Sequence, residues 1–188
     1  MNIYEACPAI QNEKYLLRLV TDDDLSDLLK VYSDVKAVSF FNGDNCHGDD
    51  FHYTTVERMR QALDFWKQAY KNGWFVRFAI VDKHTNRAVG TIEEFCREAD
   101  DFFTGCGLLR LDLRSDYEKY NEIKNILSLI VIPSFEMFGC KIVATKAVPS
   151  ATERIKALKA LGFLKSQEAL VGHDGTKYYD YFVFEKTM

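Results

Sequence analysis

The order of strand-like and helix-like segments constrains this chain more than any other feature of its sequence. Apolar residues that alternate with polar ones predict strands, and apolar residues three or four positions apart predict helices. The predicted strands are 15–20, 74–82, 88–95, 108–113, 141–147, 163–170 and 177–185, and the predicted helices are 21–32, 54–70, 121–138 and 150–162. The resulting order, β-α-α-β-β-β-α-β-α-β-β, predicts an α/β fold with one twisted mixed sheet of about seven strands and helices on both faces.

Residues at the segment ends support these boundaries. Thr54 with Glu57, and Ser150 with Glu153, have the spacing of a capping box, in which each side chain bonds the other residue's backbone N–H. Gly139 follows a predicted helix, as expected at a helix C-terminus. The short polar sequences KHTNR and GHDGT predict two hairpin turns, the second because of its Asp-Gly pair.

Length and composition limit the classes of protein to consider. A chain of 188 residues without repeats or linkers predicts a single domain, 1–188. A formal net charge of −4 argues against a nucleic-acid partner, because such proteins usually carry a basic face. Five scattered cysteines with no Cys-x-x-Cys pair predict reduced thiols and a cytoplasmic location. The most apolar stretch, 126–138, is too short to span a membrane, and the N-terminus has no signal-peptide pattern.

Several segments resemble the GCN5-related N-acetyltransferase (GNAT) family. The sequence KIVATKAVPSATERIKALKALGF (141–163) is similar to the strand, helix and Leu-Gly-Phe that end the family's cofactor-binding half. Val89-Gly90 matches an apolar-Gly pair in the family's third strand, and Phe135 before Phe138-Gly139 resembles the ribosomal-protein N-terminal acetyltransferases. The resemblance covers about 15–185 and implies transfer of an acetyl group from acetyl-CoA to a primary amine, without a metal.

The same resemblance places a pyrophosphate-binding loop at the start of the third helix. In the family, backbone N–H groups there point at the phosphates, and glycines allow a close approach. The corresponding residues, implied to bind acetyl-CoA, are Glu118, Lys119, Tyr120, Asn121, Glu122 and Ile123. Asn121 replaces a glycine and is expected to keep its left-handed turn. Glu118 and Glu122 would repel a pyrophosphate, Lys119 and Lys124 would offset part of that repulsion, and Ile123 adds bulk.

Other implied cofactor contacts also depart from the family pattern. Leu111 and Leu113 lie on the strand that would polarise the thioester carbonyl. Ala151 stands where the family often has Asn, and Leu158 stands where many members have the Tyr that acts as general acid. Arg154 replaces a Ser and could either donate to a CoA phosphate or face water.

Three residues are candidates for the acid–base chemistry. Glu93 and Glu94 are adjacent on a predicted strand, so alternation would place one of them over the cleft, where a carboxylate could act as base. Tyr179 on the last strand, with its neighbours Tyr178 and Tyr181, could present a phenol to the leaving thiolate; packing is the alternative role. Asp112 is expected to face solvent, because it alternates with leucines on a half-buried strand.

The segment 44–52 contains Asp, Cys and His residues without a recognised metal-ligand spacing. It is therefore predicted to be a solvated loop without a metal, and the resemblance places it beside the acceptor site. His84 and His173 are expected to face solvent in hairpin turns.

Two hypotheses remain open at this point. The chain is an acetyl-CoA-dependent N-acetyltransferase acting on a peptide N-terminus or a small-molecule amine, or it is a catalytically degenerate GNAT-fold binding or regulatory module. The first requires two neighbouring strands to diverge and no side chain, such as that of Ile123, to fill the gap between them. The acceptor and the choice between monomer and homodimer are left open.

Overall fold

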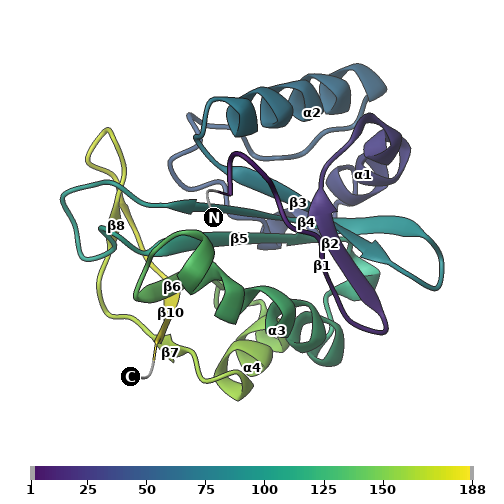
Figure 1. The fold of residues 1–188 in the computed structure, drawn as a ribbon. Coiled ribbons are helices and arrows are strands. Elements are labelled where there is room, and N and C mark those ends of the chain that lie inside the picture. Colours follow the sequence, from purple (N-terminus) through teal and green to yellow (C-terminus); the bar gives the residue numbers. More distant parts are fainter. Residues whose placement is uncertain (1–2, 187–188) are drawn as a thin grey trace.

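A computed structural model describes residues 3–186 and contains an eight-stranded sheet in the order β1-β2-β3-β4-β5-β6-β10-β7 (Figure 1). All neighbouring strands are antiparallel except β5 and β6. The strands are β1 (Ile10–Gln11), β2 (Tyr15–Leu19), β3 (Val76–Asp82), β4 (Arg87–Cys96), β5 (Gly107–Leu113), β6 (Ile142–Lys146), β7 (Leu164–Lys165) and β10 (Tyr181–Glu185). The predicted mixed sheet is confirmed, with a short additional strand, β1, at one edge.

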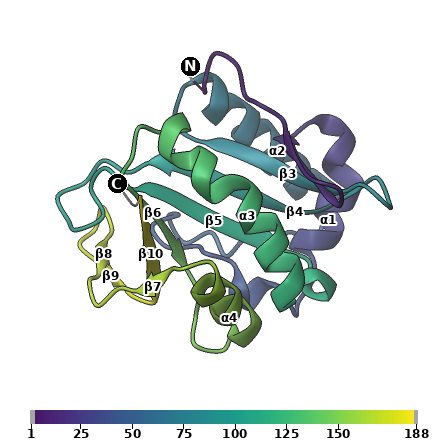
Figure 2. The ribbon, with the colours of Figure 1, turned by 60° about the horizontal axis from the view of Figure 1, so that its bottom comes forward.

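Helices cover both faces of this sheet, as predicted. Helices α1 (Leu25–Tyr32) and α2 (Val56–Lys71) pack on one face, and α3 (Tyr120–Met137) and α4 (Thr152–Ala160) pack on the other (Figures 1 and 2). A turn of 3-10 helix, Asp22–Asp24, precedes α1. Two apolar cores result, one between the sheet and α3 with α4, the other between the sheet and α1 with α2. No described helix is long and apolar enough to cross a membrane.

Both predicted capping boxes are wrong. The N-cap of α2 is Thr55, whose hydroxyl accepts the Arg58 N–H at 3.2 Å, one residue later than predicted. Helix α4 begins after Ala151 without a side-chain cap. The Glu153 carboxylate does not bond Ser150 because it accepts the Tyr120 N–H of α3 and the Lys156 ammonium instead.

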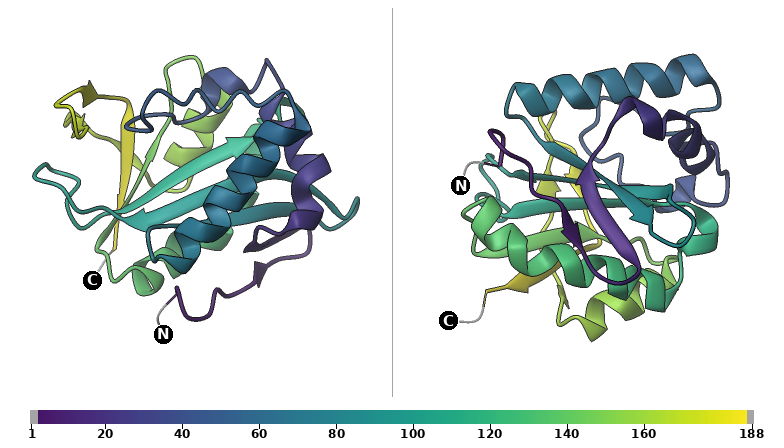
Figure 3. Two further views of the ribbon diagram at one scale, coloured as in Figure 1. Left: turned by 90° about the horizontal axis from the view of Figure 1, so that it is seen from above. Right: turned by 45° about the vertical axis from the view of Figure 1, so that its right-hand side comes forward.

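The predicted C-terminal hairpin is divided into two parts. Strands β8 (Leu170–Val171) and β9 (Lys177–Tyr178) form their own small sheet, while β10 returns to pair with β6 and β7. Asp180 separates β9 from β10 with a left-handed φ of 67°, which changes the direction of the chain. The β8–β9 hairpin therefore projects beside the sheet and does not extend it (Figure 3, left).

Strand β5 is buried on both faces. Leu109, Leu111 and Leu113 belong to the core beneath α3, whereas Arg110 and Asp112 point to the opposite face. Asp112 is only 2% exposed, so the prediction that it faces solvent is wrong. Its alternation with leucines reflects two different interiors, one apolar and one polar, and not an interior and a solvated surface.

Candidate functional site

Strands β5 and β6 diverge, as the transferase hypothesis requires. Their parallel pairing covers three residue pairs, from Gly107–Val143 to Leu109–Thr145. Beyond Leu109, β5 continues to Leu113 beside β4 alone. An opening thus forms in the middle of the sheet, at the place that the family resemblance assigns to the acyl group and its pantetheine arm.

The side chain of Arg154 fills this opening. It comes from α4 on one face, and its guanidinium donates to the Leu111 carbonyl at 2.9 Å and to the Phe40 carbonyl at 3.0 Å. Phe40 belongs to the connection between α1 and α2, on the opposite face of the sheet. Glu118 accepts two further hydrogen bonds from the guanidinium, at 2.7 and 2.8 Å. Arg154 is 1% exposed, so it neither faces water nor is free to donate to a phosphate.

The start of α3 is engaged by carboxylates of the protein itself. Glu153 accepts the Tyr120 N–H at 3.1 Å, and Glu122 accepts from the Lys14 ammonium at 2.7 Å. Asn121 is helical and has no positive φ, so the expected left-handed turn is absent at this position. The chain reaches α3 through a 3-10 turn, Ser115–Tyr117, and Lys119 is the N-cap without a side-chain bond.

The remaining residues around the opening are packed against one another. A channel open to a cofactor would leave some of their surface accessible, yet each is at most 2% exposed. These residues are Leu111, Leu113, Ile123, Ala151 and Leu158. The opening is therefore surrounded by side chains that contact one another, and acetyl-CoA would have to displace the Arg154 guanidinium to enter it.

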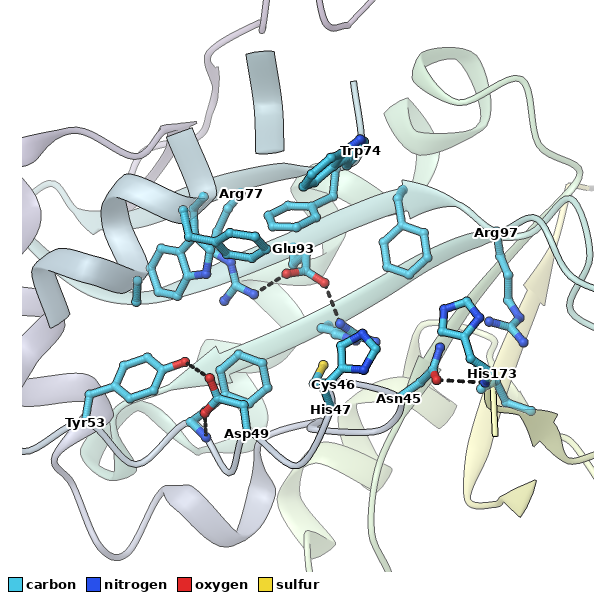
Figure 4. A pocket seen from close by; sticks show the side chains of 18 of the residues that line it. Asn45, Cys46, His47, Asp49, Tyr53, Trp74, Arg77, Glu93, Arg97 and His173 are labelled. Atoms are coloured by element: carbon cyan, nitrogen blue, oxygen red, sulfur yellow. Dashed lines mark hydrogen bonds and ion pairs between the residues drawn. The ribbon is translucent and has the colours of Figure 1, made fainter. Parts of the chain in front are cut away.

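A cavity of about 560 Å³ lies on the other face of the sheet (Figure 4). Its walls come from α2, from strands β3, β4 and β5, from the α1–α2 connection and from the β8–β9 hairpin. The lining combines aromatic, basic and acidic side chains. The aromatic ones are Phe51, Tyr53, Phe65, Trp66, Trp74 and Phe75; the basic ones are Arg58, Arg77, Arg97, Arg110, His47 and His173; and the acidic ones are Asp49, Glu93 and Glu98. This volume suits a small organic ligand.

A buried ion network forms the floor of the cavity. Arg77 donates to one oxygen of Glu93, and Arg110 donates to the other at 2.7 Å. Arg77 also donates to Asp112 at 3.2 Å. Tyr32 donates to Asp112 at 2.8 Å. The guanidinium of Arg77 lies over the Trp66 ring, 4.1 Å from its centroid. Arg77, Glu93 and Arg110 lie opposite one another on β3, β4 and β5, so their side chains share one face of the sheet.

The two carboxylates of the network have opposite pKa shifts. Burial alone would raise the pKa of Glu93, but the charges and hydrogen bonds of Arg77 and Arg110 lower it below its ordinary value. Burial raises the pKa of Asp112, and the neighbouring Arg77 offsets this only in part. Glu93 is therefore held as a carboxylate between two cations.

The three candidate acid–base residues lie in three different places. Glu93 faces the cavity, as strand alternation predicted for one member of the pair. Glu94 points to the opposite face, is 0% exposed, and neither of its oxygens has a hydrogen-bond partner within residues 3–186. Burial raises its pKa to about 8. Tyr179 lies between β9 and β10 and is 53% exposed, outside the cavity lining.

The α1–α2 connection, which the resemblance places beside an acceptor site, lines the cavity and is not a freely solvated loop. Asp44 is buried and accepts from Lys146 at 2.6 Å and from Tyr181 at 2.9 Å. The Asn45 side chain accepts the His173 N–H of the β8–β9 turn at 3.0 Å. No three His, Cys, Asp or Glu side chains within the described part of the chain could hold a metal ion together.

Sequence reasoning identified Glu93 but missed Arg77 and Arg110, which build this floor with it. The available signal was the spacing of charged residues in otherwise apolar strands, at Arg77, Glu93 and Arg110. Each points to the same face as its strand's small or polar residues, so period-two alternation could have grouped them. The aromatic residues Trp66 and Trp74 gave no separate signal, because apolar side chains on a helix or strand usually indicate core.

Comparison with known proteins supports the fold. The sequence matches no protein-family model and no curated protein. Solved structures are similar across nearly the whole chain. A Vibrio cholerae protein assigned as a ribosomal-protein-serine acetyltransferase has a TM-score of 0.72 at 13% identity and covers 99% of this chain and 100% of its own.

Two further structures are similar to this chain. The ribosomal-protein-S5-alanine acetyltransferase of Vibrio fischeri gives a TM-score of 0.68 at 20% identity, covering 95% of this chain and 96% of its own. RimJ of Mycobacterium smegmatis, solved with CoA-disulfide, gives a TM-score of 0.68 at 14% identity, covering 94% of this chain and 84% of its own. The chain therefore has the fold of the GNAT acetyltransferases, as the resemblance predicted.

Proposed function

We propose that this protein is a GNAT-fold ligand-binding module that has lost the acetyl-CoA site and holds its ligand in the cavity above Glu93. One observation carries the proposal: the buried Arg154–Glu118 ion pair stands in the opening between β5 and β6. In a CoA-dependent enzyme this opening must admit the cofactor, whereas here the chain itself closes it.

Electrostatics at the start of α3 support the loss of the cofactor site. A helix N-terminus attracts an anion through its free N–H groups and dipole. Here Glu153 already accepts one of those N–H groups, and Glu118 and Glu122 add two more carboxylates nearby. A pyrophosphate would have to displace a carboxylate and break the buried Arg154–Glu118 ion pair, and leaving one partner of such a pair buried without its counter-charge costs about 3–5 kcal/mol.

The acid–base groups also favour binding over catalysis. A general base must accept a proton, but both oxygens of Glu93 accept hydrogen bonds from guanidiniums and its pKa is lowered. Glu94 has the pKa of a better base, yet it points into the opposite core. Neither carboxyl group is therefore suited to take a proton from an amine in the cavity.

Isothermal titration with acetyl-CoA tests this proposal. The wild-type protein is expected to give no saturable binding. The double variant Glu118→Gln/Arg154→Ser restores the residue types that the family resemblance places at these positions and is expected to gain binding. Lys165→Ser/Asp180→Asn is the matched control, because it removes a solvent-accessible ion pair that involves neither α3 nor α4. Micromolar binding by the wild-type protein would contradict the proposal.

The divergence of β5 and β6 favours a second candidate, an acetyl-CoA-dependent N-acetyltransferase acting on a peptide N-terminus or a small-molecule amine. This function requires Arg154 to leave the opening before the cofactor enters. It would be supported by micromolar acetyl-CoA binding together with a mass increase of one acetyl group on an amine substrate. A cytoplasmic location, a single domain and a monomer or homodimer remain predictions from the sequence under either function.

A further inference from the structure

One end of the cavity is aromatic and partly exposed. Trp74 is 58% exposed and Phe65 is 53% exposed, and their ring centroids lie 6.4 Å apart. Phe75 continues the group, 5.9 Å from Phe65. Large aromatic rings left open at the mouth of a cavity are typical of a surface that a ligand covers.

The other end of the cavity is basic. His47 and His173 are exposed and nearly parallel, with centroids 6.3 Å apart and an interplanar angle of 11°. Arg97 and Arg110 line the cavity with them, Arg97 paired with Asp101 at 2.6 Å and Arg110 with Glu93 at 2.7 Å. Figure 4 shows His47, His173 and Arg97 grouped on one side of Glu93, away from Trp74.

The hydrogen-bonding groups of the interior are unevenly used. Both oxygens of Glu93 accept from guanidiniums, and Asp49 accepts from the Phe51 N–H, from Tyr53 and from Arg58. These interior acceptors are therefore occupied.

Two donors in the same floor are not used. The Nε atoms of Arg77 and Arg110 have no partner among residues 3–186 and are themselves buried, so a ligand in the cavity meets the positive charge of these side chains and not a free N–H group. Glu98 is also a lining residue, but it is exposed, so water can solvate its charge. A ligand with a negative charge would complement these guanidinium groups, and a cationic amine would not.

The loop that covers the cavity is held in an unusual conformation before any ligand arrives. Asn45, His47 and Phe51 have positive φ values of 58°, 54° and 57°, which is unfavourable for side chains as bulky as Phe. Arg110 holds this loop through the Asp44 carbonyl at 2.8 Å. Local backbone strain of this kind concentrates at functional sites, and a preformed site lowers the ordering cost of binding.

We propose that the cavity binds a small aromatic molecule with one negatively charged group, such as an aromatic carboxylate. The ring lies against Trp74 and Phe65, and the anion faces the basic end beside Arg97 and Arg110. This inference rests on the proposed function, because it names the ligand of the same cavity. It differs from the amine that the family resemblance implies.

Two probes of opposite charge test the proposal. 3-Phenylpropionate and 3-phenylpropylammonium share a ring and a three-carbon chain and differ in the sign of the charge. Trp66 and Trp74 are the only two tryptophans of the protein and both line the cavity, so tryptophan fluorescence reports binding directly. We expect 3-phenylpropionate to bind saturably and at least about ten-fold more tightly than the ammonium probe.

Variants connect the charge preference to the cavity. Glu93→Gln/Arg110→Gln removes one carboxylate and one guanidinium together, so the net charge of the floor is kept and Arg77 retains Asp112 as its ion partner. The variant is expected to abolish the preference. Trp74→Leu should weaken both probes to a similar extent. Lys165→Ser/Asp180→Asn should change neither. Circular dichroism and thermal melting confirm that each variant is folded before it is titrated.

Three outcomes would overturn the inference: equal or tighter binding of the ammonium probe, no saturable binding of either probe, or a charge preference that survives in Glu93→Gln/Arg110→Gln. The acetyl-CoA titration is independent of these results. Wild-type binding of acetyl-CoA would remove the proposed function while leaving the charge preference of the cavity measurable.

Discussion

Replacing Arg154 is the most direct way to test whether the opening in the sheet is closed in solution. Arg154→Met keeps an unbranched side chain of similar length but removes four hydrogen bonds, two to carbonyl oxygens and two to Glu118. It leaves the Glu118 carboxylate, 6% exposed, without its cation. Breaking a buried pair from one side costs about 3–5 kcal/mol, a large part of the roughly 5–15 kcal/mol by which such a domain is stable.

A double-mutant cycle separates the pair from its surroundings. Glu118→Gln is expected to cost less, about 1–3 kcal/mol, because the neutral amide loses the charge but keeps an oxygen that can accept a hydrogen bond. The double variant Glu118→Gln/Arg154→Met should be more stable than the sum of the single changes implies, with a coupling energy on the order of 2 kcal/mol.

Urea unfolding followed by circular dichroism measures these free energies of unfolding. The control is Lys156→Met on the same helix, which breaks an exposed ion pair with Glu153 and should cost about 1 kcal/mol or less. If Arg154→Met is no more destabilising than Lys156→Met, the guanidinium does not occupy the opening in solution. The opening between β5 and β6 would then be free to admit acetyl-CoA.

Three further changes have expected results that thermal or urea unfolding can check. Glu94 has a pKa raised by burial from 4.5 to about 8, so wild-type stability should fall as pH rises through this range, by up to about 5 kcal/mol. Glu94→Gln should lack this loss, and parallel pH profiles would contradict the assignment. Thr55→Ala should lower the free energy of unfolding by about 1 kcal/mol, because it removes the observed cap of α2, whereas Thr54→Ala should be nearly neutral. The reverse order would show that Thr54 is the N-cap, as the sequence predicted. Gly90→Ala would place a Cβ in a clash with the Asp112 carbonyl oxygen, a backbone atom that cannot move alone. The variant should lose on the order of 3 kcal/mol of stability or fail to fold, and a stable variant would show that the β4–β5 pairing is looser than described.

Sequence periodicity was sufficient to predict the fold because it reports local geometry. The α/β class, the element order, the β3–β4 hairpin and the helices on both faces all follow from apolar spacing and turn residues. Boundaries failed where a distant group competed for a local partner. Glu153, for example, has the spacing of a capping residue but caps Tyr120 in a different helix.

The candidate site was predicted only in part. Glu93 was identified, and the α1–α2 connection was placed beside the cavity. The partner of each charge was not predictable, because the ion network joins residues from separate strands and loops. Asp112 shows the difficulty: a polar residue alternating with leucines fits either a solvated face or a buried polar one, and only the packing of α1 and α2 distinguishes them.

The sequence by itself determined the architecture and showed that the family's phosphate-binding residues had changed, since each substitution is visible at its own position. It could not show that two of those changes, Glu118 and Arg154, compensate each other, because they are 36 residues apart and meet only when α4 packs beside β5. Tertiary structure decided that the opening is filled and that the usable cavity lies on the opposite face. The physical reason is that a charge can be buried only beside its partner, and that proximity is a property of the folded chain.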